Sequence, residues 1–239
     1  MAISHVATGT IVAGTTAASP AYPAGIAAGD ALFLFAGACN PAAVTYPTLS
    51  GFTLVLDLSL GGGSHGAGIG PRRMAVYRKD VVDGTETGTV TVTPTGTSDM
   101  ILAGITCWRV AAGRGWDVAY ASGSDTSPGT ATSITADAVL GEATGDVMLG
   151  GVCGPTNSNM AGQTFNATGA TYGTASEVGE IGTNNGDDGR LAILQRPITA
   201  GRATAATVYS ATSTQSAGCI FVRLREVSLP SLVMARYAV

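Results

Sequence analysis

Short apolar stretches recur along the chain, and clusters of Gly, Pro, Asn and Ser separate them. The stretches are rich in Val, Ile, Thr and aromatic residues, a pattern typical of β-strands. In the first half they predict strands over residues 4–12, 31–39, 52–58, 73–80, 88–93 and 101–110. The stretch 31–39 carries no charged or hydrogen-bonding side chain, so we expect it in the middle of a sheet. The pattern therefore predicts an all-β protein.

Three pairs of segments match between the two halves of the chain, in the same order and at nearly the same spacing. They begin at Gly29 and Gly145, at Arg73 and Arg190, and at Ala103 and Ala217, with offsets of 116, 117 and 114 residues. We interpret the match as two tandem sequence repeats, residues 1–112 and 113–226, followed by an unrepeated apolar arm over 227–239. The joint at 111–115 has only turn length. We therefore expect residues 1–226 to form a single two-layer antiparallel β-sandwich in which each half covers the other.

Composition and charge exclude several classes of function. The 239 residues include 12 Lys and Arg against 16 Asp and Glu, a net charge of −4, so no basic surface is expected for nucleic acid. The longest clean apolar run is far too short to cross a membrane, and the N-terminal residues do not resemble a secretion signal. The four cysteines are widely separated, and we predict that all are reduced and mostly buried: Cys39, Cys107, Cys153 and Cys219.

Several segments could carry chemistry, and each has a simpler structural interpretation. Residues 62–66 fit the G-x-S-x-G pattern of hydrolases, but the following residues cannot start a helix, so we predict a loop. Residues 184–189 offer oxygen ligands for Ca²⁺ without EF-hand spacing and are interpreted as a polar turn. Asp30 and Asp146 each follow a Gly at the start of a strand, where Asp commonly accepts hydrogen bonds from turn amides. Lys79, the only lysine, is interpreted as an exposed charge at a strand end.

Aromatic residues could line a sugar-binding platform, although packing within the sheets is the commoner role. The candidates for such a platform are Trp108, Trp116, Tyr120, Tyr172 and Tyr209. Two histidines in the whole chain make a histidine-based metal site improbable. We assign no catalytic residue, no metal site and no cofactor, and we expect that the protein is not an enzyme.

One set of motifs resembles a known family. Gly29-Asp30 before an apolar strand, the turn 47–53, the Arg73–Tyr77 strand and Trp116-Asp117 follow in an order similar to that of bacteriophage virion proteins of the minor tail or capsid decoration type. The second half departs from it, because residues 162–165 replace the Pro-Gly-aromatic-Thr turn. The resemblance implies a jelly-roll-like sandwich and a structural role in the virion, assembled in the host cytoplasm, and it carries over no catalytic residue.

The resemblance and the unrepeated arm together predict how the protein acts. We expect a non-enzymatic virion protein, a head decoration or tail component, whose partners are copies of itself as a homo-oligomer and other virion proteins. The alternative is a carbohydrate-binding or host-adhesion module that binds a host surface glycan; neither nucleic acid nor a membrane is an expected partner. The arm supplies the candidate assembly residues, which are Leu229, Leu232, Val233, Met234 and Tyr237.

Overall fold

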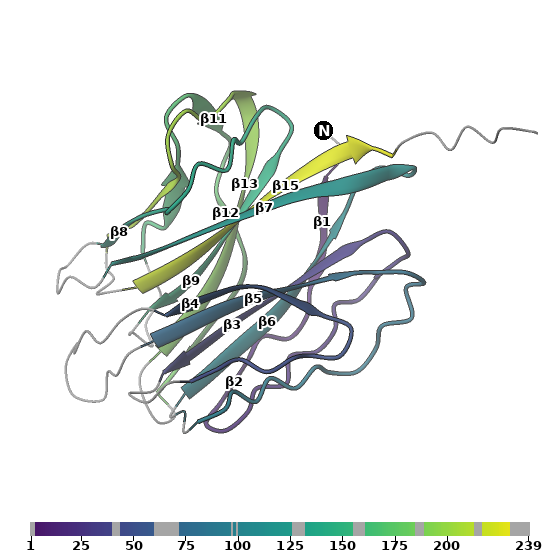
Figure 1. The fold of residues 1–239 in the computed structure, drawn as a ribbon, viewed down its shortest axis with the longest axis vertical. Helices are drawn as coiled ribbons and strands as arrows, with labels where there is room; N and C mark the ends of the chain where they lie inside the picture. Colours follow the sequence, from purple (N-terminus) through teal and green to yellow (C-terminus); the bar gives the residue numbers. More distant parts are fainter. Residues whose placement is uncertain are drawn as a thin grey trace, which may run out of the picture.

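The computed structural model describes residues 3–39, 44–59, 72–96, 98, 100–125, 132–154, 161–184, 189–212 and 217–229. Within these ranges the regular elements are β-strands, and no helix occurs. The strands form two large antiparallel sheets and a small one. Figure 1 shows the large sheets as separate layers, with β3, β5 and β6 in one and β7, β13 and β15 in the other.

The first large sheet consists of strands from the first half of the chain. In the described ranges its strands are β1 (Ser4–Thr8), β2 (Val12–Gly14), β3 (Ala31–Cys39), β4 (Thr53–Ser59), β5 (Arg72–Asp80) and β6 (Met100–Arg109). Their order is β1-β6-β3-β5-β4, and β2 pairs with β6 beyond the end of β1. The central place of β3 confirms the prediction made from its uninterrupted apolar sequence.

The second large sheet consists of strands from the second half. Its described strands are β7 (Arg114–Asp125), β9 (Val147–Gly154), β11 (Ala170–Tyr172), β12 (Ser176–Thr183), β13 (Gly189–Gly201) and β15 (Ala217–Ser228). Their order is β11-β13-β9-β15-β7, and β12 also pairs with β13. The small sheet has the order β10-β14-β8 and contains β8 (Thr132–Thr135), β10 (Thr164–Asn166) and β14 (Val208–Ala211).

Three apolar clusters hold these layers together. The central cluster lies between the large sheets, with Phe33 and Phe35 from β3 meeting residues such as Leu149 and Ile220 from the second half. A second cluster covers the outer face of the first sheet with loop residues, and a third lies between the second sheet and the small one. The antiparallel β-sandwich is confirmed, and the outer apolar layers are additions that a two-layer prediction did not include.

The two large sheets are built alike. The order β1-β6-β3-β5-β4 corresponds to β7-β15-β9-β13-β12, strand for strand. The central strands β3 and β9 also start at equivalent points, after positive-φ glycines Gly29 and Gly145. The likeness describes the architecture, and the origin of the two halves in a sequence duplication stays a prediction.

Two predicted strands differ from the structure. The predicted strand 4–12 is interrupted between Thr8 and Val12, although the Gly9 N–H still donates to the Ile105 carbonyl of β6. Residues 88–93 form only isolated bridges, at Thr89 and Val92. Their partner segment contains Pro20 and Pro23, which have no N–H to donate, so a continuous ladder does not form there.

Candidate functional site

β15 runs to Ser228, so the first two residues of the predicted arm, 227–239, belong to this strand and the arm begins later than predicted. Leu229, the first of the candidate assembly residues, is 54% exposed and lies against Gly115 of β7, where an added Cβ would be 2.7 Å from the Leu229 Cδ2 atom. The remaining predicted arm residues lie outside the described part of the chain: Leu232, Val233, Met234 and Tyr237. The described structure therefore locates the base of the arm, beside the first residues of β7.

β7 and β4 form one open side of the sandwich. The two strands are neighbours across the large sheets. Partly buried apolar side chains from both strands pack against the rim of the central cluster. They are Val55, Leu56 and Leu58 on β4 and Trp116, Val118 and Tyr120 on β7. All six side chains are only partly buried, so this rim is an apolar strip that water reaches.

Asp30 and Asp146 occupy equivalent positions and make equivalent contacts. Asp30 Oδ2 accepts from the Ala27 N–H, and Asp146 Oδ2 accepts from the Ala143 N–H, each at 2.8 Å. These bonds confirm the interpretation of both residues as acceptors for turn amides. Asp30 lies directly before β3 and Asp146 directly before β9, in different sheets, so each carboxylate serves its own turn and not a paired catalytic site.

Sequence reasoning missed the arginine partners of the two aspartates. The Arg109 Nε–H donates to Asp30 Oδ1 at 2.7 Å, and the Arg225 Nε–H donates to Asp146 Oδ1 at 2.8 Å. Burial alone would raise the pKa of Asp30, but hydrogen bonds from Arg109, the Ala27 N–H and Cys107 lower it overall. Both pairs span 79 residues. Arg109 recurs 116 residues later as Arg225, just as Asp30 recurs as Asp146. This shared spacing was the signal that could have revealed the two pairs.

Lys79 is not an exposed strand-end charge, so that prediction is wrong. Its side chain is 20% exposed, its Nζ lies 3.2 Å from Glu86 Oε1, and it sits over the Tyr22 and Phe52 rings at 5.4 and 5.9 Å. Burial lowers the pKa of Lys79, but the hydrogen bond and charge of Glu86, with Tyr22, outweigh burial and raise it. The lysine therefore ties the loop after β5 to an aromatic cluster.

The aromatic candidates do not form one exposed platform. Trp108 and Tyr209 are fully buried, and each has its polar atom bonded inside the protein, to Thr106 and Gln163. Trp116 is half-buried, and its Nε1–H donates to the Gly29 carbonyl of the other half at 3.0 Å. Packing is thus the observed role of these rings.

The cysteines that the structure describes fit the predicted state. Cys107 and Cys219 are buried free thiols, and Cys153 is buried as well, whereas the side chain of Cys39 lies outside the described residues. Burial raises the pKa of Cys107 and of Cys219, which keeps both protonated. No disulfide is described among these three.

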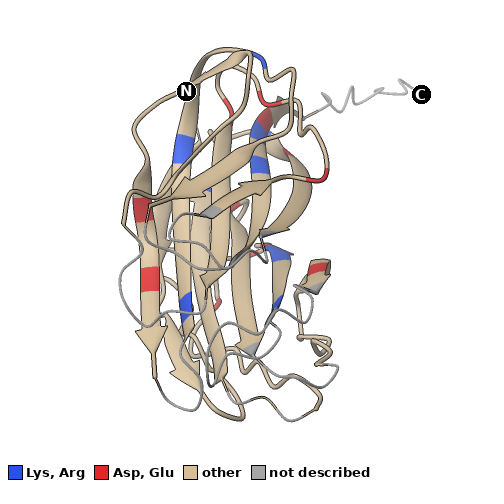
Figure 2. Cartoon of the chain, turned by 90° about the vertical axis from the view of Figure 1, so that its left-hand side faces the viewer, with Lys and Arg blue, Asp and Glu red and all other residues tan. Residues whose placement is uncertain are grey.

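The other candidate motifs are described only in part. The G-x-S-x-G segment, 62–66, and most of the acidic loop, 185–188, lie outside the described residues. Elsewhere in the described ranges no three His, Cys, Asp or Glu side chains gather as they would around a metal ion. A search of the same ranges for a helix long and apolar enough to span a membrane finds none. Figure 2 shows how thinly the charged residues are spread along the described chain.

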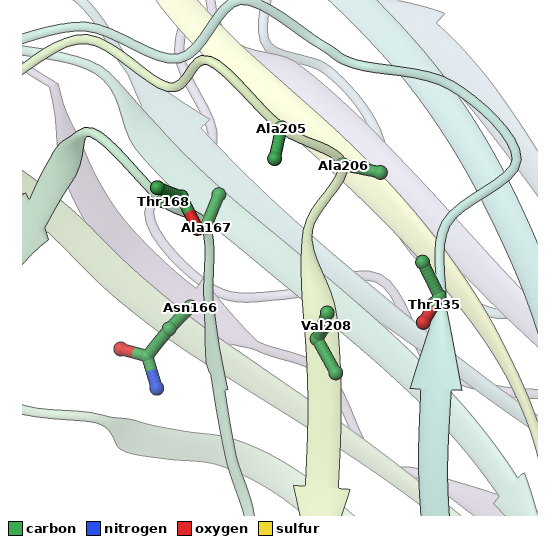
Figure 3. Close-up of a pocket in the computed structure, with 7 residues that line it drawn as sticks. All are labelled: Thr135, Asn166, Ala167, Thr168, Ala205, Ala206 and Val208. Carbon is green, nitrogen blue, oxygen red and sulfur yellow. The ribbon is translucent and has the colours of Figure 1, made fainter.

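A shallow hollow of about 490 Å³ lies on the outer face of the small sheet. Figure 3 shows Val208 on the central strand, between the strands that carry Asn166 and Thr135. The remaining lining residues are Ala167, Thr168, Ala205 and Ala206. The Asn166 amide oxygen accepts from Arg196 at 2.7 Å, so it is already engaged. Methyl groups, hydroxyls and one amide line the hollow, a set that offers surface contact more than acid–base chemistry.

Comparisons with protein-family models, with curated proteins and with solved structures give no match for this chain. The structure therefore defines the fold class of the chain. It is an antiparallel β-sandwich whose two large sheets share a central core.

Proposed function

We propose that this chain is a non-enzymatic structural protein of a bacteriophage virion, a head decoration or tail component. It assembles through contacts with copies of itself and with other virion proteins. The motifs around Asp30, Arg73 and Trp116, which resemble those of such proteins, support the bacteriophage context. The assembly role rests on the site at the β7–β15 end.

The observation that carries the assembly role is the juxtaposition of three features. A twelve-residue strand, β7, lies at the edge of its sheet, a partly exposed apolar rim lies beside it, and the base of the apolar arm lies at its first residues. Exposed apolar strips and strand edges are surfaces that proteins ordinarily cover with a partner. A structural protein that assembles from copies has such a partner.

The test is the composition of intact particles. Particles of the phage that encodes this chain should contain it in a fixed copy number, measured by quantitative mass spectrometry after density-gradient purification. Antibody labelling in electron micrographs should then locate it on the head or on the tail. Absence from purified particles would contradict the proposal, and saturable binding on a glycan array, lost on one aromatic substitution, would favour a host-adhesion module instead.

A further inference from the structure

One stretch of β7 has backbone groups without a described partner. Ser122 uses both of its backbone groups on Asp137: its N–H donates to Asp137 Oδ1 at 2.9 Å, and its carbonyl accepts from the Asp137 N–H at 2.7 Å. These bonds point away from β15. In an antiparallel ladder the direction alternates from residue to residue, so Trp116, Val118 and Tyr120 turn their backbone groups to the same outer side. In the described part of the chain no strand pairs with that side.

The side chains of the same three residues point to the rim of the central cluster, beside β4. A strand added along the outer side of β7 would continue the sheet over this rim. It would satisfy the outward backbone groups and cover the exposed parts of the rim side chains. Backbone pairing and apolar cover thus favour the same place for a partner.

This edge lacks the features that usually prevent strand addition. β7 contains no Pro or Lys, and its register with β15 runs from Arg114 to Asp125 without a bulge. Its one central charge, Asp117, is held by Arg223 at 2.6 Å and lies 3.8 Å from Arg225. The charge is therefore neutralised within the sheet.

We propose that the outer edge of β7, from Trp116 to Tyr120, binds the C-terminal arm of a second copy of this chain, residues 230–239, as an added β-strand. This inference rests on the proposed assembly function and names its acceptor site. Strand addition to a sheet edge is a common mode of peptide recognition, in which backbone bonds supply affinity and alternate side chains supply specificity.

The arm is suited to this edge by its length and its sequence. Ten residues in extended form span about 33 Å, more than the five-residue stretch of edge requires. Leu232, Val233 and Tyr237 are strand-forming or apolar residues able to cover the rim.

The position of the base indicates that the arm comes from another copy. β15 pairs with the inner side of β7 and runs antiparallel to it, with Ser228 opposite Arg114. At Leu229, the last described residue, the chain has therefore reached the start of β7. To reach the outer side of its own β7 it would have to reverse and cross that strand, whereas a neighbouring copy has no such constraint.

The experiment uses two complementary variants of the full chain. One lacks residues 230–239 and keeps the edge; the other carries Val118→Pro, which removes an outward N–H while leaving the β15 ladder intact. Sedimentation velocity should show association of the unaltered chain and at least tenfold weaker association of each variant alone. An equal mixture of the two should associate again, because one supplies the arm and the other the edge.

Two surface substitutions keep the test decisive if Val118→Pro does not fold. Val118→Lys places a charge on the rim, at the proposed edge itself, and should weaken association at least tenfold. Val82→Lys, a matched change at a residue that is 86% exposed in the turn after β5, should leave association unchanged.

Three outcomes would overturn the inference. The first is full association of the arm-deleted chain with itself, which would indicate that β7 edges pair with each other. The second is failure of the mixture to associate. The third is a full chain that stays monomeric up to high concentration. None of them bears on whether purified particles contain the protein, so the proposed function is judged separately.

Discussion

The two large sheets have the same strand order, yet their equivalent edges differ. Along β6, the edge consists of β1 and β2, with a register shift between His5 and Ala7 and a break before β2. Along β15, the equivalent edge is the single unbroken strand β7. Breaks and bulges are the usual protection of an edge against another strand. The edge formed by β1 and β2 is therefore protected against strand pairing, whereas the edge formed by β7 can accept a partner strand.

Gly9 and Gly179 allow close packing at the β1–β2 end. A Cβ on Gly9 would lie 1.9 Å from the Ala21 carbonyl oxygen, so only glycine lets the segment at Ala21 pass so close to the chain here. Two residues later Ile11 lies over β12, where its Cδ1 atom lies 2.3 Å from the position of a Cβ on Gly179. The rim at this end therefore includes a side chain from the link between β1 and β2, whereas the β4–β7 rim consists of side chains from its two strands.

The largest effect is expected from the core that both ends share. Phe35 packs on Gly151, its equivalent 116 residues later, where a Cβ would lie 2.2 Å from the ring. Phe35→Ala should lower the free energy of unfolding by about 4 kcal/mol. Because the cluster joins both halves, urea unfolding followed by tryptophan fluorescence and by circular dichroism should show one coincident transition. Two separate transitions would contradict a shared core and indicate independent halves.

The next prediction compares how much the equivalent aspartate–arginine pairs stabilise the two halves. Asp30→Asn and Asp146→Asn should each cost about 3 kcal/mol, because each leaves an arginine without its carboxylate beside a buried turn. A difference of more than about 2 kcal/mol between the two variants, measured by urea unfolding, would show that the likeness of the sheets does not extend to their energetics.

Asp30 also gives the protein a pH dependence. Its pKa is lowered in the folded state, so its contribution to stability is present above its unfolded pKa of about 3.9 and is lost as the pH falls through the folded value. The free energy of unfolding of the unaltered chain should therefore decrease as the pH is lowered from 6 to 2. The decrease should be smaller for Asp30→Asn. Equal slopes of the unfolding free energy against pH for the two proteins would contradict the assignment of this pH dependence to Asp30.

A smaller effect compares the two ends directly. Ile11→Ala at the β1–β2 end should cost about 2 kcal/mol, because it opens a space over Gly179. Val118→Ala at the open end should cost about 1 kcal/mol in dilute solution, where its side chain is only partly covered. Chemical unfolding of both variants checks the order, and a larger cost at Val118 would mean that the β7 rim is already covered.

The smallest effect is expected from the arm. Deletion of residues 230–239 should change the Tm in dilute solution by less than about 2 °C, because the arm serves assembly more than folding. Differential scanning calorimetry at low protein concentration measures this. A loss of several degrees would indicate that the arm stabilises its own sandwich instead.

Local pattern was enough to predict the central strands but not the edges. β3 was predicted to the residue, because its sequence is apolar throughout, as is typical of a buried central strand. β5 was predicted almost to the residue from its apolar centre, Met74–Tyr77, which charged residues flank. The break after Thr8 was missed, since Gly9 and Ile11 also suit a strand, and only the distant Ala21 and Gly179 decide against it.

Side-chain partners were harder to predict than strands. The aspartates were recognised as turn acceptors from the preceding Gly, a local signal, but Arg109 and Arg225 are far away in sequence. The environment of Lys79 depends on Tyr22 and Glu86, which the fold brings together from separate loops. Contacts of this kind depend on the tertiary arrangement, which one sequence does not reveal.

Amide hydrogen exchange of β7, followed residue by residue by NMR, tests the central claim most directly. In the dilute arm-deleted chain, the outward amides of Trp116, Val118 and Tyr120 should exchange rapidly, while those of Asp117 and Ala119, which face β15, should exchange slowly. In the full chain the three outward amides should become protected as the concentration rises. Slow exchange of these amides in the dilute arm-deleted chain, or no gain in protection on association, would contradict an open edge that accepts the arm.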